Sequence, residues 1–543
     1  MAVFTFKLIR LEDGIPSIEG NSLQDVLTGL GYVHAQDRGI QMLLMRLLGR
    51  GRLAQSLAPL EEFIHWDIYF RRLTPSSEEY MELDSLSPQI HLLLQAYCKG
   101  VNEWFETHPI PKLLQLLGLS WWPWKTTDIF LVGKLIGYIG LAETQAYVER
   151  WIRDVIRAGL PVQMLDELFP GMLIGVDPEL ISKSTEASFS LPPHPIHDIE
   201  LLPQGSNNWV VSGDHSISGY PILANDPHIQ INYLPSIWYE VVLKWTYNNK
   251  SCYAAGISIP GIPGIVIGRT AKLAWGVTYA CIDNTDSWIE KCKPGYYWKN
   301  NKWIPFTKRA EIIYRRCKSP IQVCFYENEH GTITEPTKWN ELMVITRWAV
   351  STKDSLHSIE ALLNLLLAHT VREARTLLSS ITNGAWNWVI ADRTGHIGFQ
   401  MSGIVPIRAN GWSGLIPMPG WDKSWDWLGF ASPEALPSCE DPPEGILITA
   451  NNPMDHYGKI HCTSFTMGHY RASRIKDLLL QKEKLTVDDM LQIQLDVFSP
   501  QAALYMERIK PLLPFLESKY PYHVKTLQQW DCKYHLESKG AAI

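Results

Sequence analysis

The spacing of hydrophobic residues changes close to residue 205. Before that point, apolar residues recur at intervals of three and four, as in amphipathic helices. After it, short runs rich in β-branched and aromatic residues are typical of strands. The pattern therefore predicts a mainly helical region over residues 1–184, a linker over 185–205 and a strand-rich region over 206–543.

Helix starts are predicted by capping boxes, in which a hydroxyl residue precedes an acidic residue by three positions. These are Ser22 with Asp25, Thr370 with Glu373, and Thr486 with Asp489. Helical periodicity also covers 358–368, 371–379 and 473–484. Strands are predicted over 209–212, 237–245, 252–259, 274–279, 287–291, 343–348 and 388–391. Together these elements predict an α+β fold, with helices around antiparallel strands.

Residues 182–204 interrupt both periodicities. Pro192, Pro193, Pro195 and Pro203 stand there among serine, threonine and histidine residues. Proline-rich polar segments are typical of extended connections. An exposed linker is therefore predicted immediately before the strand-rich region.

Composition narrows the function classes. The 543 residues are 46% hydrophobic and 19% charged, so the chain can bury a large core. A formal charge of −7 without a basic cluster argues against nucleic acid as a partner. The longest apolar run, Ile129 to Ala142, contains Lys134 and is shorter than the ~20 residues that a membrane span needs. No membrane partner is expected.

The N-terminus and the cysteines bear on location and metal binding. Arg10, Glu12 and Asp13 come early, without a hydrophobic signal core, so a cytoplasmic location is expected. If the N-terminus is incomplete, a secreted or periplasmic location is expected instead. The nine scattered cysteines include no C-x-x-C pair, which argues against a zinc site and a disulfide framework.

A candidate nucleophile lies where the periodicity changes. Ser206 follows Gly205 and opens a predicted strand, and the chain contains no G-x-S-x-G elbow. If the chain is cut before Ser206, the new α-amino group, which titrates near pH ~7.7–8.0, can serve as the base for the hydroxyl. Gly205 permits the strained backbone of an internal acyl shift. Gly-Ser-Asn-Asn is also typical of an ordinary turn, and on these residues both interpretations stay open.

The blocks around Ser206 resemble the maturation site of the penicillin acylase family of N-terminal-nucleophile hydrolases. These blocks are Gly205–Trp209 and Leu223–His228, and similar blocks follow in family order. They are Gly29–Met42, Gly49–Leu57, Pro260–Gly264, Leu273–Thr278, Thr449–Asn452 and Tyr470–Ile475. The resemblance implies a four-layer αββα sandwich. It also implies that 1–184 becomes an α chain, 185–205 a spacer and 206–543 a β chain.

The implied activity is hydrolysis of a linear amide bond. The resemblance implies an autocatalytically processed amidohydrolase that cleaves the acyl side-chain amide of penicillin-like or other N-acyl substrates. Its catalytic residues would be Ser206, His228, Tyr279, Asn451 and Arg471. The amide of Asn451 and the backbone N–H of Tyr279 would hold the oxyanion. On the sequence alone, each of these residues is also compatible with a purely structural role, in a turn, in a core or at a helix start.

A calcium site is implied next to the strand that ends at Tyr279. Asp283, Thr285 and Asp286 offer oxygen ligands, and Glu149 would complete the site from the first chain. The ion would be structural and would join the two chains. D-x-x-D alone is typical of a turn. No organic cofactor is expected.

An apolar acyl pocket is implied by four further positions. They are Ile229, Ile267, Val277 and Trp386. Apolar walls suit an aliphatic or aromatic acyl group, although such residues are equally typical of a core.

The end of the chain and its aromatic content leave two alternatives. Residues 530–543 resemble the start of a helical segment that continues further in relatives, so a C-terminally truncated product is expected. One alternative is therefore an inactive truncated relative. The other, raised by 22 tryptophans, is an aromatic-rich ligand-binding protein without catalysis.

Overall fold

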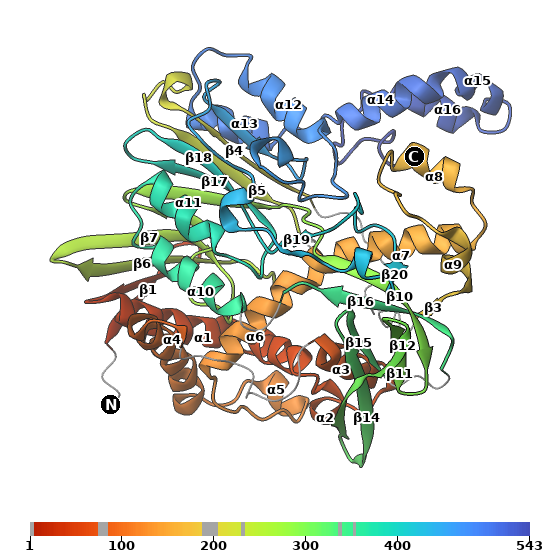
Figure 1. The fold of residues 1–543 in the computed structure, drawn as a ribbon. Helices are drawn as coiled ribbons and strands as arrows, with labels where there is room; N and C mark the ends of the chain where they lie inside the picture. The colour runs from red at the N-terminus through yellow and green to blue at the C-terminus, as the bar shows by residue number, and fades with distance from the viewer. Residues whose placement is uncertain (1–4, 74–84, 187–204, 230–233, 335–338, 351–353) are drawn as a thin grey trace.

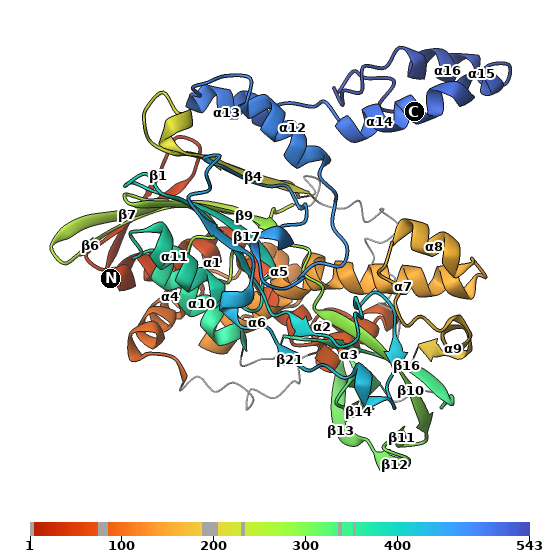
Figure 2. The ribbon, with the colours of Figure 1, turned by 45° about the horizontal axis from the view of Figure 1, so that its top comes forward.

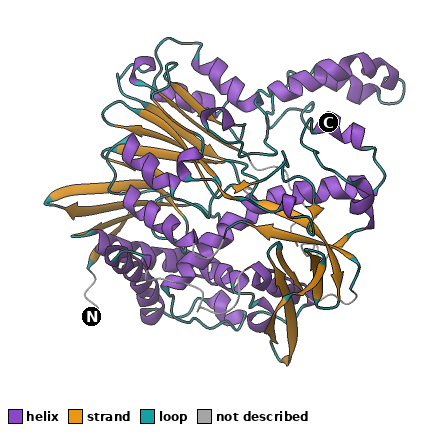
Figure 3. Ribbon diagram, in the orientation of Figure 1, coloured by secondary structure: helices purple, strands orange, loops and turns teal. Residues whose placement is uncertain are grey.

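The computed structural model describes residues 5–73, 85–186, 205–229, 234–334, 339–350 and 354–543. Helices dominate the first part of the chain and strands the middle, and together they build a mixed α/β structure with several sheets (Figure 3). No helix among these residues is long and apolar enough to cross a membrane.

A nine-stranded sheet forms the centre of the molecule, in the order β1-β2-β6-β7-β8-β9-β17-β18-β22. Its strands pair antiparallel except β2 and β6, which run parallel. The buried faces of β9 and β17 join the apolar core. The strands are β1 (Phe6–Arg10), β2 (Pro16–Gly20), β6 (Tyr239–Tyr247), β7 (Lys250–Ser258), β8 (Ile267–Thr270), β9 (Leu273–Tyr279), β17 (Trp386–Asp392), β18 (Ile397–Ser402) and β22 (Ser438–Glu440).

A three-stranded sheet lies against the middle of this large sheet. Its order is β23 (Ile446–Thr449), β4 (Ser206–Val211) and β5 (Ile222–Pro227). Strands β4 and β5 contact β9 and β17, and β23 contacts β17 and β18. The stacking brings the start of β4 next to the end of β9.

Helices cover the outer faces of both sheets (Figure 2). Helix α1 (Leu23–Gly49) packs on β2 and β6, and α10 (Asp354–Leu365) and α11 (Val371–Ser379) lie on the same side. Helices α12 (Tyr470–Leu479) and α13 (Val487–Gln494) pack on the small sheet, where Ile475 and Met490 meet Trp209. The layers are thus helix, small sheet, large sheet and helix.

The N-terminal helices pack around α1. Helix α4 approaches α1 closely because Gly31 and Gly100 lack side chains: a Cβ on either would lie about 2 Å from a carbonyl oxygen of the other helix. The remaining helices of this region are α2 (Leu53–Ser56), α3 (Glu61–Leu73), α4 (Pro88–Thr107), α5 (Lys112–Leu116), α6 (Thr126–Gly137), α7 (Glu143–Arg157), α8 (Val162–Leu168) and α9 (Pro178–Lys183), with the kinked turn η3 (Tyr138–Ala142) between α6 and α7.

A second set of strands lies beside α7 and α3 (Figure 1). One sheet has the order β12-β11-β10-β16-β3 with β20 on β10, another the order β13-β14-β15, and β19 pairs with β21. The strands are β3 (Thr185–Glu186), β10 (Thr285–Lys293), β11 (Tyr296–Lys299), β12 (Lys302–Pro305), β13 (Thr307–Arg315), β14 (Lys318–Asn328), β15 (Gly331–Thr334), β16 (Leu342–Trp348), β19 (Pro406–Ile407), β20 (Met418–Pro419) and β21 (Gly429–Phe430).

The C-terminal helices extend away from this body. They are α14 (Pro500–Ile509), α15 (Leu513–Leu516) and α16 (Pro521–Gln528), and they project to one side of the molecule in both views (Figures 1 and 2).

The capping predictions are confirmed. Ser22 accepts a hydrogen bond from the backbone N–H of Asp25, and the other two boxes form completely. The predicted strand over 209–212 starts earlier, at Ser206, because Asn207 and Asn208 pair with β5 although they are polar. The hairpin β13–β14 was not predicted, since its many exposed polar residues hide the alternation.

The linker prediction was wrong at its start. Helix α9 continues to Lys183, the side chain of Ser184 is buried, and Thr185 and Glu186 pair with β16. Packing against a strand far along the chain overrides the local composition there. Residues 187–204, the rest of the predicted linker, lie outside the described residues.

Candidate active site

Ser206 is the first residue of β4, between β5 and β23. Its backbone N–H donates to Asn451 Oδ1 at 2.7 Å. The backbone N–H of His228 donates to the carbonyl oxygen of Gly205 at 2.9 Å, which extends the β4–β5 pairing past Ser206. The peptide group between Gly205 and Ser206 is therefore held at both its carbonyl and its N–H.

Asn451 follows β23 and holds three neighbours with one side chain. Its backbone φ is +62°, a conformation that asparagine tolerates better than most residues. Its Oδ1 accepts from Ser206 N and, at 2.8 Å, from Arg471 Nη2. Its Nδ2 donates to the carbonyl oxygen of Tyr279 at 2.8 Å. The side chain is 1% exposed, so its orientation is set by these contacts.

The backbone N–H of Tyr279 faces the edge of β9 next to the small sheet. The backbone N–H of Ala280 donates to the carbonyl of Ala385, the residue before β17, and successive residues of a strand direct their N–H groups to opposite edges. Tyr279 N–H therefore points to the same side as the N–H of Val277. The backbone N–H of Val277 donates to Asn225 Oδ1 at 3.0 Å. This contact places that edge of β9 beside β5.

Asn225 has a structural role that was not predicted from the sequence. Its Nδ2 donates to the carbonyl of Asn207 in β4 at 2.8 Å and to that of Val277 in β9 at 3.0 Å. The side-chain amide of Asn225 thus pairs with Val277 of β9 as a backbone peptide group would. The same amide also binds Asn207 of β4. Gly276 is required opposite, because a Cβ there would lie 2.8 Å from Asn225 Cβ. A polar residue inside a strand is the signal that could have singled out Asn225.

Arg471, at the start of α12, lies against the Gly205–Ser206 bond. Its Nη1 donates to the carbonyl of Ser206 at 2.9 Å and to Asn207 Oδ1 at 2.8 Å. A Cβ on Gly205 would lie 3.1 Å from the guanidinium, so glycine lets the chain pass close to it. Burial lowers the pKa of Arg471 from its ordinary value.

His228 directs its backbone, not its imidazole, at this bond. The imidazole Nε2 pairs with Asp226 Oδ2 at 3.1 Å, and the His228 side chain is 51% exposed. Burial alone would raise the pKa of Asp226, but the hydrogen bond from His228 lowers it overall. The structure therefore places a carboxylate–imidazole pair beside β4, the strand that begins with Ser206.

The four predicted acyl-pocket positions do not surround a large cavity. Ile267 and Val277 are buried in the core, and Ile229 is partly buried. Trp386, opposite Tyr279 in the β9–β17 pair, lines a cavity of about 40 Å³ with core residues such as Ile262.

The predicted metal ligands do come together. Carboxylate oxygens of Glu149, Asp283 and Asp286 lie within 4.8 Å of one another, and all three residues are at most 1% exposed. Arg408 donates to Asp286 Oδ2 at 2.7 Å and to the backbone carbonyl of Asp283 at 2.8 Å. Arg153 pairs with Glu149 at 3.3 Å.

Several buried oxygens of this acidic cluster (Glu149, Asp283, Asp286) and its neighbours lack hydrogen-bond partners. They are Glu149 Oε1, Asp283 Oδ1 and Oδ2, Asn284 Oδ1, Thr285 Oγ1 and Asp286 Oδ1. Burial raises the pKa of Asp283 to about 7, against the attraction of Arg408. Gly414 leaves space, because a Cβ there would lie 2.5 Å from Asp283 Oδ2. Asp283 Oδ1 lies 3.5 Å from Arg408 Nη2, and hard oxygens without hydrogen-bond partners around such a space fit a calcium ion.

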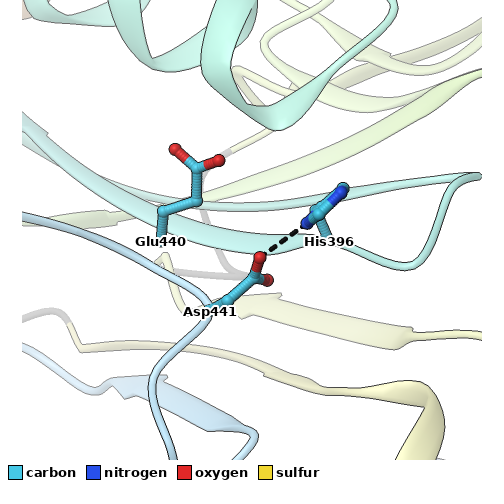
Figure 4. Close-up of side chains that lie close together, drawn as sticks. All are labelled: His396, Glu440 and Asp441. Carbon is cyan, nitrogen blue, oxygen red and sulfur yellow. Dashed lines mark hydrogen bonds and ion pairs between the residues drawn. The ribbon is translucent and has the colours of Figure 1, made fainter.

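A second acidic group lies at the β18–β22 edge (Figure 4). His396 Nδ1 pairs with Asp441 Oδ2 at 2.6 Å, and this hydrogen bond raises the pKa of His396. Glu440 points elsewhere, to Arg375 at 2.8 Å and Arg372 at 3.4 Å. With Glu440 already paired to guanidinium groups, this cluster is a surface ion-pair network.

Comparison with known proteins identifies relatives over nearly the whole chain. A family model described as penicillin amidase matches residues 7–543. An acyl-homoserine lactone acylase QuiP from Pseudomonas aeruginosa is 28% identical over 92% of this chain and 60% of the relative. The QuiP of Pseudomonas fluorescens Pf0-1 is 31% identical over 82% of this chain and 56% of the relative. A penicillin acylase 2 proenzyme from Pseudomonas sp. SE83 is 29% identical over 97% and 69%.

A solved structure agrees at the level of the fold. A thermostable penicillin G acylase from Alcaligenes faecalis superposes with a TM-score of 0.51 at 22% identity, covering 61% of this chain and 60% of that one. This chain spans 60% and 56% of the length of the two QuiP relatives. The expected truncation stays a prediction.

Proposed function

This chain belongs to the penicillin amidase family, and from that membership we propose that it cleaves its own Gly205–Ser206 bond and then hydrolyses N-acyl amides through Ser206. The observation that carries the proposal is the contact of Ser206 N with Asn451 Oδ1, at 2.7 Å, beside the end of β9. That contact links a hydroxyl, its own nitrogen and a side-chain amide in one site.

The proposed chains follow the predicted regions. Residues 1–184 form the α chain, 185–205 the spacer and 206–543 the β chain. The four layers of helix, small sheet, large sheet and helix support assignment to the αββα sandwich of N-terminal-nucleophile hydrolases.

In self-cleavage, Ser206 Oγ attacks the carbonyl carbon of Gly205. The C–N bond breaks as the acyl group moves from nitrogen to oxygen, and water then hydrolyses the resulting ester. The backbone N–H of His228, 2.9 Å from that carbonyl oxygen, stabilises the charge that develops on it. Arg471 positions the bond through the carbonyl of Ser206.

Cleavage converts Ser206 N into a free α-amine that keeps Asn451 Oδ1 as its acceptor. Near pH ~7.7–8.0 the unprotonated amine takes the proton of Oγ as Oγ attacks a substrate amide. Asn451 Nδ2 has a second hydrogen beyond the one given to Tyr279 O, and with Tyr279 N–H it binds the oxyanion. The amine product leaves with the transferred proton, and water releases the acid.

Calcium has a structural part in this proposal. Glu149, Asp283, Thr285 and Asp286 would hold it, as their unpaired oxygens support. The bound ion would supply positive charge that ties α7 of the α chain to β10 of the β chain. No step of the reaction passes through it.

Substrate preference belongs to the same proposal. We assign Ile229, Ile267, Val277 and Trp386 to the surroundings of the first carbons of the acyl group. Trp386 contributes most directly, because it pairs with Tyr279 across β9 and β17.

Replacement of Ser206 tests the proposal. Wild-type protein should separate on a denaturing gel into chains derived from 1–205 and 206–543, the second beginning Ser-Asn-Asn-Trp on N-terminal sequencing. Ser206→Ala should stay intact and hydrolyse no N-acyl amide, because both the hydroxyl and the new amine are lost.

The exposed Ser218, in the same segment, supplies the control, and Ser218→Ala should process normally. Processing of Ser206→Ala would rule the mechanism out. An intact wild-type chain without activity would identify an inactive relative, and binding without turnover a ligand-binding protein.

A further inference from the structure

Four polar side chains lie in the otherwise apolar layer between the small sheet and the large sheet. All four are at most 1% exposed. Other positions on the same faces of these strands, among them Val210, Leu447 and Val389, form one apolar cluster. The polar side chains are those of Asn208 in β4, Thr449 in β23, Thr278 in β9 and Asn387 in β17. Burial of polar groups in such a layer is unfavourable unless they find hydrogen-bond partners.

Strand pairing gathers these side chains at one place. Asn208 lies opposite Thr449 in the β4–β23 pair. Asn387 lies opposite Thr278 in the β9–β17 pair, and the hydroxyl of Thr278 donates to Thr449 Oγ1 at 3.1 Å across the layer. A Cβ on Gly276 would lie 2.7 Å from Asn208 Oδ1, so this amide rests on β9 two residues from Thr278. Asn208 and Asn387 are therefore both neighbours of Thr278.

The amides of Asn208 and Asn387 lack partners of their own. Among the residues that the structure describes, no group hydrogen-bonds with Nδ2 or Oδ1 of either side chain. A buried donor or acceptor without a partner destabilises a fold. A buried water molecule typically makes about three hydrogen bonds to groups of this kind, because it both donates and accepts. The two amides and the threonine hydroxyls offer such a set of partners.

The chemistry of this polar cluster (Asn208, Thr278, Asn387, Thr449) favours water over an ion. Its side chains are neutral amides and hydroxyls, which present donors and acceptors together. A divalent cation is held largely by carboxylates that offset its charge, and the cluster contains none. An anion would face the two amide oxygens, which only accept hydrogen bonds.

We propose that Asn208 and Asn387 bind buried water between the two sheets, and that this water holds β4 in place against β9 and β17. One amide belongs to the small sheet and the other to the large sheet. Water that binds both amides therefore connects the two sheets, next to the direct bond between Thr278 and Thr449.

The water site lies directly behind the candidate active site. Side chains alternate along a strand, so Ser206 and Asn208 point to the same face of β4. Thr278 precedes Tyr279, whose backbone N–H is assigned to the oxyanion. Asn208 and Asn387 are thus positioning residues. Resting on the proposed function, they fix the distance between the nucleophile and this oxyanion donor.

A high-resolution crystal structure of the wild-type protein tests the water site directly. It should show one water, or a hydrogen-bonded chain of waters, that links an amide atom of Asn208 to one of Asn387, with each contact within about 3.2 Å. This result does not depend on whether the chain is cleaved or active. A direct hydrogen bond between the two amides, or amide atoms in contact with apolar side chains only, would overturn the site.

Removal of the amides tests whether they share the water. Leucine has nearly the volume of asparagine but no polar atoms. Asn208→Leu and Asn387→Leu are made in the Ser206→Ala background, so that all variants are compared as intact chains. Each should lower the melting temperature by several degrees, because the remaining amide loses a partner. The double variant should lose clearly less than the sum of the two single losses, because no amide is left unpaired.

Asn208→Leu combined with Ile313→Val is the matched control. Ile313 is buried in a separate apolar cluster with Val323 and Phe325, so the two losses should simply add. Additive losses in the pair Asn208→Leu and Asn387→Leu as well would overturn the shared water. If a leucine variant does not fold, as circular dichroism would show, Asn208→Ala and Asn387→Ala complete the same cycle.

Kinetics test the positioning role. In processed protein, Asn208→Leu should lower kcat for an N-acyl amide roughly ten- to hundredfold and leave KM nearly unchanged, because a small shift of Ser206 disturbs the reaction more than it disturbs binding. Asn208→Thr keeps a hydroxyl for the water and should recover most of the loss. A loss that Asn208→Thr does not recover, or a change in KM alone, would overturn the positioning role.

The outcomes separate the water site from the proposed function. Water between the two amides, together with melting temperatures that do not add, supports the site even if no substrate is hydrolysed. An active enzyme without that water, and with additive losses, would overturn the site and leave the proposed function standing.

Discussion

Asn451 shows how much one side chain contributes at the residue scale. Its two polar atoms bind the nitrogen of Ser206, the guanidinium of Arg471 and the carbonyl of Tyr279. Because the side chain is fixed before substrate arrives, its remaining N–H needs little reorganisation to bind an oxyanion. Its left-handed backbone further limits which residue can stand there.

Removal of this amide should lower catalysis strongly. In Asn451→Ala, kcat for an N-acyl amide should fall by about 10²–10³, as for other oxyanion donors. The measurement is steady-state kinetics on processed protein. Asn301→Ala is matched, since Asn301 also has positive φ (+58°) but lies in an exposed turn. A kcat unchanged in Asn451→Ala would contradict the role.

At the scale of elements, buried polar bridges hold neighbouring strands together. Asn225 joins β5 to β4 and β9. Similarly, His330, between β14 and β15, pairs with Glu290 of β10 at 2.5 Å and with Asp426 at 2.9 Å, and stacks on Trp288. Such groups fix the register and orientation that apolar packing leaves open.

The His330 bridge predicts a pH dependence of stability. Burial lowers the pKa of His330, but the hydrogen bonds with Asp426 and Glu290 raise it overall above the ordinary 6.5. Because the folded pKa is higher than the unfolded one, the stabilisation is complete below pH ~6.5 and is lost as the pH rises through the folded value.

His330→Gln should therefore lower the free energy of unfolding by about 1–3 kcal/mol near pH 6 and by less near pH 9. Urea unfolding at both pH values measures the difference. His461→Gln, at an exposed histidine, should show little change at either pH. An equal loss from His330→Gln at both values would refute the charged bridge.

At the scale of the whole molecule, the acidic cluster joins parts that would become separate chains in the proposed cleavage. Glu149 belongs to α7, whereas Asp283 follows β9 and Asp286 lies in β10. Two arginines neutralise part of the charge, and the remaining unpaired oxygens leave a place for a cation. Stability of the processed protein should therefore depend on that ion.

Chelation should lower the melting temperature, and added calcium should restore it. Well above the Kd, each tenfold rise in free calcium should add about 1.4 kcal/mol of stability. Glu149→Gln should weaken this response, while Asp154→Asn, at an exposed site on the same helix, should keep it. Melting temperatures unaffected by chelator and calcium would exclude a calcium site.

Local sequence features predicted many of the helices and strands and several residues of the candidate site. Capping boxes set helix starts, and short apolar runs located β6, β7, β9 and β17 of the central sheet to within a few residues, whereas the other five strands of that sheet were not predicted. Motifs in family order pointed to Ser206, Asn451 and Arg471, which the structure brings into contact. These signals lie within a few neighbouring residues, so the linear chain contains them completely.

Contacts between residues that are distant in the sequence determine the features of the fold and site that could not be predicted. Ser206 and Asn451 stand 245 positions apart, and the amide of Asn225 reaches β9 only because two sheets stack. The burial of Ile267 and Val277 and the position of the guanidinium groups among the acidic residues likewise follow from how the layers pack. Local order thus specified the candidate nucleophile and many of the element types, while the packing of remote segments determined which groups meet, because distances between remote segments are not encoded by neighbouring residues.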